Sequence, residues 1–229
     1  TELGLYASYS GGHEWVKLHL KNLPTVAVHD ILIHPRENDL ILGTHGRGIW
    51  ILDDATTVQQ TSTAITAAEI YLFDIRPALR FAMKPTRYGI GNKVFQGPNP
   101  PYGASITYYL KDKPAKDTAA SLEILDGERK IIRVIAKLPL EAGINRVAWD
   151  LRGEGPRLRR QREVEEDFFS RGPRGPQVLP GTYLVRLTVG GKIVEKPVEV
   201  KLDPTLSLPT ESLRLQYGYS LKLIEMTSA

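Results

Sequence analysis

The sequence contains no cysteine among its 229 residues, which excludes disulfide bonds, thiol nucleophiles and thiolate-bound zinc. It also lacks any apolar run near the roughly 20 residues that a membrane-spanning helix needs, so we expect no transmembrane segment. Excess charge of one sign is small: the formal net charge is +4, which does not indicate a nucleic-acid partner. Neither Met nor a signal peptide opens the chain, and we therefore expect a mature or truncated product.

The composition is that of a folded globular protein, with 41% hydrophobic and 24% charged residues. Short apolar runs separated by glycine-containing turns fill residues 1–54, with no helical pattern between them. This pattern predicts antiparallel β-structure. Residues 55–101 are rich in Thr and Ala at first and in Gly, Pro and Asn at the end, and we interpret them as an extended linker between two domains.

The second half of the chain has two different patterns. Residues 102–204 hold about seven short alternating runs, which is typical of an immunoglobulin-like or fibronectin-III-like β-sandwich. A charged insertion at 153–180 interrupts them. Residues 209–227 repeat apolar side chains at helical spacing, which predicts a C-terminal helix with one apolar face.

Two N-terminal motifs resemble a known family. The stretch Ser8–Trp15 (SYSGGHEW) resembles the Asp-box of BNR-repeat β-propellers, S-x-D-x-G-x-x-W, with Ser10 in the place of the Asp. Gly43–Leu52, together with Val28-His29-Asp30 and His34-Pro35, resembles the last blade of large sortilin-like or "glycosyl hydrolase, BNR repeat" bacterial proteins. In those proteins a linker, a small β-sandwich and a helical end follow the propeller, and the order here is the same.

The resemblance implies a mainly β fold and an extracytoplasmic location, periplasmic or secreted. The expected order is a partial propeller blade region at 1–54, then an immunoglobulin- or fibronectin-III-like sandwich and a short C-terminal helix. Residues 1–54 supply about one blade, whereas a propeller needs at least four. Their open strand edges would be covered by missing propeller blades, by a protein partner or by the sandwich itself.

The densest polar cluster supplies the candidate ligand-binding residues His29, Asp30, His45 and Arg47, which would lie at the mouth of a propeller. The alternative is a structural role in turns. His34 belongs to the same stretch, but its spacing from His29 directs the two side chains to opposite faces of a strand. We therefore predict no metal site, and no cofactor is expected.

Catalytic residues are not evident in the sequence. Glycoside hydrolysis needs two carboxylates about 5–10 Å apart across a cleft. Asp53 and Asp54 are adjacent at a strand end, so we expect them in a turn. No Ser/His/Asp arrangement has the context of a nucleophile. We predict that this chain has no catalytic residue.

The charged insertion contains the candidate partner-binding residues Arg157, Arg159, Arg160, Phe168 and Phe169. The acidic run between the arginines and the two phenylalanines neutralises the basic field locally, which favours a solvated or partner-docking loop over a phosphate site. The adjacent aromatic residues either pack under the sandwich or anchor a partner.

These patterns favour a non-catalytic extracytoplasmic binding or scaffolding protein, in one version an accessory structural subunit on the outer face of a membrane-associated complex. The alternative is the C-terminal part of a carbohydrate-active propeller protein, of glycoside hydrolase or sialidase type, whose catalytic blades lie elsewhere. Glycan binding by the sandwich is a third interpretation.

Overall fold

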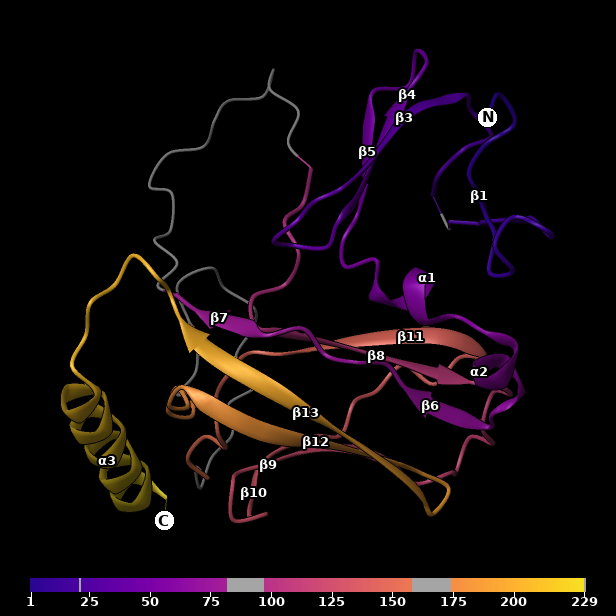
Figure 1. Cartoon of the computed structure of the whole chain (residues 1–229). Helices are drawn as coiled ribbons and strands as arrows, with labels where there is room; N and C mark the ends of the chain where they lie inside the picture. Colours follow the sequence, from indigo (N-terminus) through magenta and orange to yellow (C-terminus); the bar gives the residue numbers. More distant parts are fainter. Residues whose placement is uncertain (21, 82–96, 158–173, 229) are drawn as a thin grey trace. The chain divides into compact units, whose positions relative to one another are not determined.

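The computed structural model describes residues 1–20, 22–81, 97–157 and 174–228, and its fold is mainly β. The chain divides into two compact units, Thr1–Glu69 and Ile70–Ala229 (Figure 1). The described elements of the N-terminal unit are β1 (Tyr6–Ala7), β2 (Val16–Lys17), β3 (Val28–Ile33), β4 (Leu40–Thr44), β5 (Ile49–Leu52), α1 (Thr56–Gln60) and α2 (Thr63–Ala67). Those of the C-terminal unit are β6 (Ile70–Leu72), β7 (Ala78–Arg80), β8 (Ala104–Leu110), β9 (Ala120–Leu125), β10 (Ile131–Ile135), β11 (Gly143–Trp149), β12 (Gly181–Val189), β13 (Lys192–Leu202) and α3 (Thr210–Thr227).

The N-terminal unit is built on a small antiparallel sheet with the order β3-β4-β5, beside the two-stranded β1-β2 hairpin. Alternate residues of the central strand, Leu40 and Leu42, are buried because successive side chains of a strand point to opposite faces. They pack with Leu5, Val28 and Ala55 in a core of five buried hydrophobic residues among those described.

Two tight hairpins of this unit are anchored in the same way. In the first, Ser8 Oγ accepts a hydrogen bond from Gly12 N at 2.7 Å, and Ser10 Oγ accepts one from Glu14 N at 2.8 Å. The Trp15 indole donates to Gly12 O at 3.1 Å. In the second, the Trp50 indole donates to the carbonyl three residues earlier, at 3.0 Å. Ser10 thus ties the turn even though the Asp of the Asp-box is absent.

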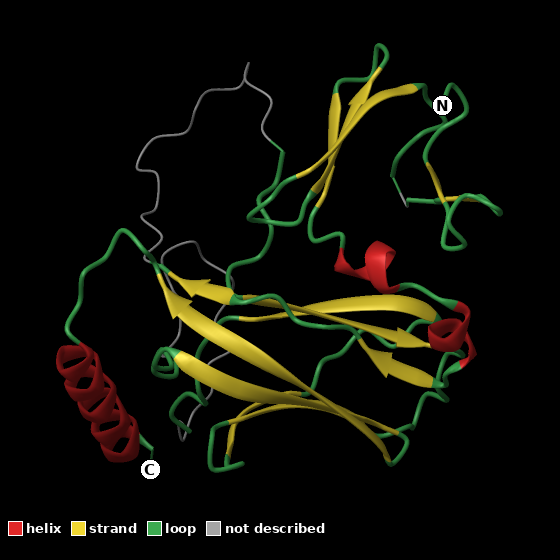
Figure 2. Ribbon diagram, viewed as in Figure 1, coloured by secondary structure: helices red, strands yellow, loops and turns green. Residues whose placement is uncertain are grey.

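The C-terminal unit encloses one core between two sheets (Figure 2). The larger sheet has the order β10-β9-β12-β13-β7 and is curled like half a barrel, and the smaller has the order β11-β8-β6. Neighbouring strands are antiparallel except β13 and β7, which are parallel. The strongly alternating strands β8, β9 and β12 supply most of the sixteen buried hydrophobic residues of this core: Leu72, Ala78, Ala104, Ile106, Tyr108, Leu110, Leu122, Ile124, Trp149, Leu151, Val178, Val185, Leu187, Val189, Val198 and Val200.

The two ends of the charged insertion lie side by side, because the backbone at Gly153 closely approaches the backbone at Gly175. A Cβ on Gly175 would lie 1.9 Å from Gly153 O, so only glycine fits at this position. Gly153 N donates to Pro176 O at 3.0 Å, and Arg152 forms an isolated β-bridge with Gln177. This contact fixes where the side chains of residues 152 and 174–177 lie.

The structure confirms the mainly β fold and the C-terminal helix, which is α3. It differs from the expected linker at 55–101, whose described part contains α1, α2, β6 and β7. β6 pairs with β8 and β7 pairs with β13, so both strands belong to the sheets of the C-terminal unit. A run of three residues is too short to show a period of two, which is why the sequence pattern did not reveal β7.

We expect the core between the two sheets to dominate the stability of the C-terminal unit. Replacing Ile124, which is fully buried on β9, should lower the free energy of unfolding by about 2–5 kcal/mol in the Ile124→Ala variant. The matched control is Ile193→Ala, because Ile193 on β13 is 58% exposed. The free energy of unfolding of Ile193→Ala, measured by denaturant unfolding, should differ from the wild-type value by no more than about 0.5 kcal/mol. Equal losses in the two variants would contradict this placement of the core.

Candidate functional site

Two of the four predicted ligand-binding side chains lie together. The ring centroids of His29 and His45 are 5.1 Å apart, with 32° between the ring planes. His29 occupies a β-bulge of β3, where the register shifts between Val28 and Asp30, and His45 follows the end of β4. Both imidazoles are exposed. A bulge re-aims the side chain that it carries, which is how these two rings meet across neighbouring strands.

The other two predicted residues do not complete a site with the histidines. Asp30 Oδ1 accepts a hydrogen bond from Ile31 N at 2.9 Å. Arg47 is exposed in the β4-β5 turn, where its carbonyl accepts the Trp50 indole. No cluster of three or more His, Asp or Glu side chains suited to a metal ion occurs within the described part of the chain. The arrangement is an exposed imidazole pair formed by the bulge of β3 and the residue after β4.

Two further polar residues from the sequence analysis have structural contacts. His34 Nδ1 accepts a hydrogen bond from Glu37 N at 3.0 Å, which closes a turn. The buried carboxylate of Asp54 accepts hydrogen bonds from Thr56 N at 3.2 Å and from Thr56 Oγ1 at 2.5 Å, at the start of α1. Asp54 therefore lies in the short connection between β5, which ends at Leu52, and α1, which begins at Thr56.

Of the predicted partner-binding residues, the structure describes Arg157, which is exposed and whose backbone N donates to Ser228 Oγ at 3.2 Å. Arg159, Arg160, Phe168 and Phe169 lie outside the described residues.

An exposed apolar surface lies on the two outer strands of the β3-β4-β5 sheet. We call it the blade surface and define it by its residues with their exposed fractions: Ile31 (51%), Leu32 (56%), Ile33 (47%), Ile49 (73%) and Ile51 (59%). Three of these residues are consecutive on β3, so they point alternately to its two faces. Both faces of this strand are therefore exposed, and β3 and β5 are the edges of the sheet.

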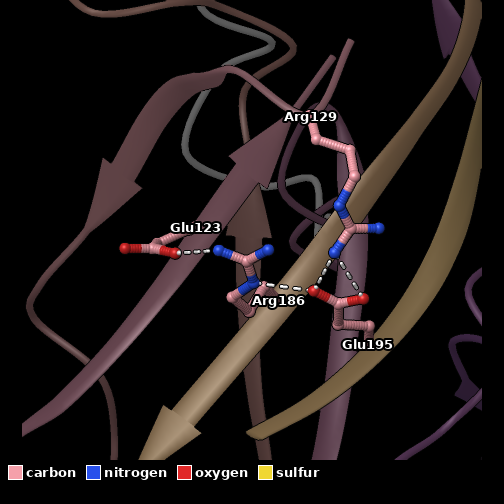
Figure 3. A network of polar contacts seen from close by, with 4 residues as sticks. All are labelled: Glu123, Arg129, Arg186 and Glu195. Carbon is pink, nitrogen blue, oxygen red and sulfur yellow. Dashed lines mark hydrogen bonds and ion pairs between the residues drawn. The ribbon is translucent and has the colours of Figure 1, made fainter. Parts of the chain in front are cut away.

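A network of four charged side chains lies on the larger sheet of the C-terminal unit (Figure 3). Arg186 on β12 stands directly opposite Glu123 of β9 and Glu195 of β13. Its Nε donates to Glu195 Oε1 at 2.7 Å and its Nη1 donates to Glu123 Oε2 at 3.4 Å. Arg129 Nη2 donates to both carboxylate oxygens of Glu195, at 2.8 and 3.0 Å.

This network follows the pattern of cross-strand ion pairs that stabilise a solvated sheet face. The hydrogen bonds from Arg186 and then from Arg129 hold the pKa of Glu195 below its ordinary value. In turn, the hydrogen bonds that Arg186 forms with Glu195 and with Glu123 raise the pKa of Arg186. Each charge has an opposite partner, so we assign the network to stability.

The C-terminal unit also has a cavity lined by three arginines, which the sequence did not predict. Two cavities of about 400 Å³ each share the side chains of Arg80, Arg152 and Arg174 as well as Gln177, Leu213 and Gln216. We call them the arginine cavity. Its three arginines are far apart in the sequence and meet through the β7-β13 pairing and the bridge between Arg152 and Gln177. No local motif marks them.

No family model matches the chain, and no curated protein or solved structure matches it. The BNR-repeat and sortilin-like resemblance therefore stays a prediction. Among the described residues, no helix is both long enough and apolar enough to cross a bilayer.

The Glu195 network leads to a prediction about pH. Because folding lowers the pKa of Glu195, its stabilising effect is fully present above the ordinary value of 4.5 and is lost as the pH falls through the lowered pKa. The difference in free energy of unfolding between the wild type and Glu195→Gln should be largest near neutral pH and should shrink below pH 4.5. Added salt should also reduce this difference, because the network is partly exposed to solvent. Glu128→Gln is the control, because Glu128 lies outside the network. If the difference in free energy of unfolding between the wild type and Glu195→Gln grew as the pH fell, the assignment would be contradicted.

Proposed function

We propose that this chain is a non-catalytic extracytoplasmic binding or scaffolding protein, and that its blade surface binds a β-sheet of another polypeptide. The observation that carries the proposal is the run of three exposed apolar residues, Ile31 to Ile33, on an edge strand. The extracytoplasmic part rests on the family resemblance alone.

The energetics of the blade surface support a bound partner. Burying an Ile or Leu side chain stabilises a structure by about 1.5–3 kcal/mol relative to leaving it in water. The five side chains of the blade surface are each about half exposed or more, so most of this stabilisation is not realised. The strand register places Leu32, Ile49 and Ile51 on one face of the sheet, and Ile31 and Ile33 on the other. Exposed groups of apolar side chains such as the first mark interaction sites on soluble proteins.

The strands themselves favour a partner with β-structure. Edge strands of natural proteins are usually protected by lysine, proline or a cover, because their free backbone groups pair readily with other strands. β3, β4 and β5 contain neither lysine nor proline, and Asp30 is their one carboxylate. Four of the five blade-surface residues are isoleucine, a β-branched residue that packs well between stacked sheets.

The same features argue against two other kinds of partner. A surface that binds anionic lipid or nucleic acid carries clustered Lys and Arg, and these three strands have none. The hairpins anchored by Trp15 and Trp50 agree with the resemblance to propeller blades, which pack sheet against sheet.

Photo-crosslinking from the blade surface tests the proposal. A photoreactive residue replaces Ile51, which is 59% exposed, and the matched control position is Ile193, which is 58% exposed on the other unit. In cells that produce the chain, position 51 should crosslink to one polypeptide, at a β-strand of that partner, and position 193 should not. Absence of a crosslink at 51, or the same products from both positions, would contradict the proposal.

A charge on the blade surface should abolish partner binding without unfolding the chain. We expect Ile51→Lys to weaken the complex by tenfold or more, because the ammonium group would be desolvated at the interface. The free energy of unfolding of the chain alone should change by less than about 0.5 kcal/mol, since residue 51 is exposed. Co-purification with the crosslinked partner and denaturant unfolding measure the two effects. Retained binding by the folded variant would contradict the role of this surface.

A further inference from the structure

The arginine cavity contains a buried cation, Arg80, that forms no ion pair with the described residues. Arg80, on β7, is only 9% exposed. Its Nε donates to Gln177 Oε1 at 3.2 Å, its Nη1 to Val178 O at 3.1 Å and its Nη2 to Gln216 Oε1 at 3.3 Å. All three acceptors are neutral. Within the described part of the chain, Arg80 has no carboxylate partner.

The second and third arginines add to this uncompensated charge. Arg152 Nη1 donates to Gly175 O at 2.7 Å, another neutral acceptor. Arg174 is exposed and lines both parts of the cavity. Three of the hydrogen bonds of Arg80 and Arg152 therefore end on residues 175–178, which directly follow Arg174 in the chain.

The described carboxylates near the cavity do not neutralise the arginines. Asp150 is the single acidic residue among the described lining residues, so the lining carries three positive charges and one negative charge. Asp203, next to β7 through its backbone, accepts hydrogen bonds from Thr205 N at 2.9 Å and Thr205 Oγ1 at 2.6 Å. Its carboxylate is thus used within its own turn.

A charge removed from water is costly unless an opposite charge or hydrogen bonds compensate it. Burial in the cavity lowers the pKa of Arg80, and the positive charge of Arg152 acts in the same direction. The cost would fall if an anion entered, because guanidinium groups form short, charge-assisted and often bidentate hydrogen bonds with oxyanions. The three hydrogen bonds of Arg80 give it a structural role. That role explains Arg80 alone, and it does not explain why Arg152 and Arg174 line the same cavity.

We infer that the arginine cavity binds a small organic ligand through an oxyanion group, held by Arg152 and Arg174 beside Arg80. The volume of about 400 Å³ exceeds the space needed for a single oxyanion group, and apolar side chains of α3 line one part. Leu213, Tyr217 and Ile224 would contact the carbon body of the ligand. The cavity lies wholly within the C-terminal unit, so this inference is independent of the blade surface.

Titration calorimetry of the full chain with four probes tests the inference. Phenyl phosphate, phenyl sulfate and citrate distinguish a phosphate, a sulfate and a carboxylate as the anionic group, and inorganic phosphate tests the group without a carbon body. Sodium chloride holds the ionic strength constant, because screening alone alters the binding of anions. We expect saturable binding of at least one organic probe with one site per chain. No saturable binding of any organic probe at millimolar concentration would overturn the inference.

Variants locate the site. Arg174→Gln should lower the affinity for the probe about tenfold, which corresponds to the loss of a charge-assisted hydrogen bond. Arg214→Gln is the matched control, because Arg214 is an exposed arginine of α3 that does not line the cavity. It should leave the affinity within about twofold. An equal loss of probe affinity in Arg174→Gln and Arg214→Gln would show that only the net charge of the chain matters. It would overturn the placement of the site in this cavity.

A second variant guards against a loss of folding. Arg152→Lys keeps the positive charge but loses the planar fork that matches an oxyanion, so it should also weaken the probe. Unfolding midpoints of the ligand-free variants show which of them are folded. Undiminished affinity in folded Arg152→Lys and Arg174→Gln would contradict the role of these side chains.

Discussion

Burial of apolar surface is the interaction on which both units depend, and the two units satisfy it to different degrees. In the C-terminal unit, sixteen described hydrophobic side chains are buried between two sheets. The N-terminal unit buries five in its main cluster, and its outer strands leave isoleucines and a leucine exposed. Its sheet has three short strands and two open edges, whose free backbone groups pair readily with other strands. The proposal that another β-sheet covers it follows from this imbalance.

Charges show the same contrast between complete and incomplete compensation. On the larger sheet, Arg186 lies between two carboxylates that are its direct cross-strand neighbours. This pairing stabilises the folded sheet and leaves no surplus charge for a ligand. In the arginine cavity the guanidinium groups of Arg80 and Arg152 donate to neutral oxygen atoms among the described residues. A ligand that brings a negative charge would supply what the described residues lack there.

The sequence predicted those features that arise from local patterns. Alternating strands such as β8 and β12, the glycine-containing hairpins and the helix α3 all have a period that can be counted over several residues. The serines of the Asp-box-like stretch were also recognisable, and Ser10 binds the turn backbone. The edge strand β7 was missed because three residues are too few to show a pattern.

The candidate sites were less predictable, since they depend on contacts between distant residues. His29 and His45 meet because a bulge interrupts the alternation of β3, and nothing in the local sequence marks that bulge. Arg80 and Arg152 share a cavity only because a parallel strand pair and a single bridge bring their segments together. Such long-range pairings follow from the fold as a whole.

The native mass of the chain tests the central claim most directly. Light scattering on a sizing column would measure it for protein purified from its source without denaturant. If the blade surface binds another polypeptide, the chain will elute in an assembly larger than its own mass of 25.6 kDa, together with that partner. A monodisperse species of 25.6 kDa would contradict the claim, because the exposed strands would then persist in solution without a cover.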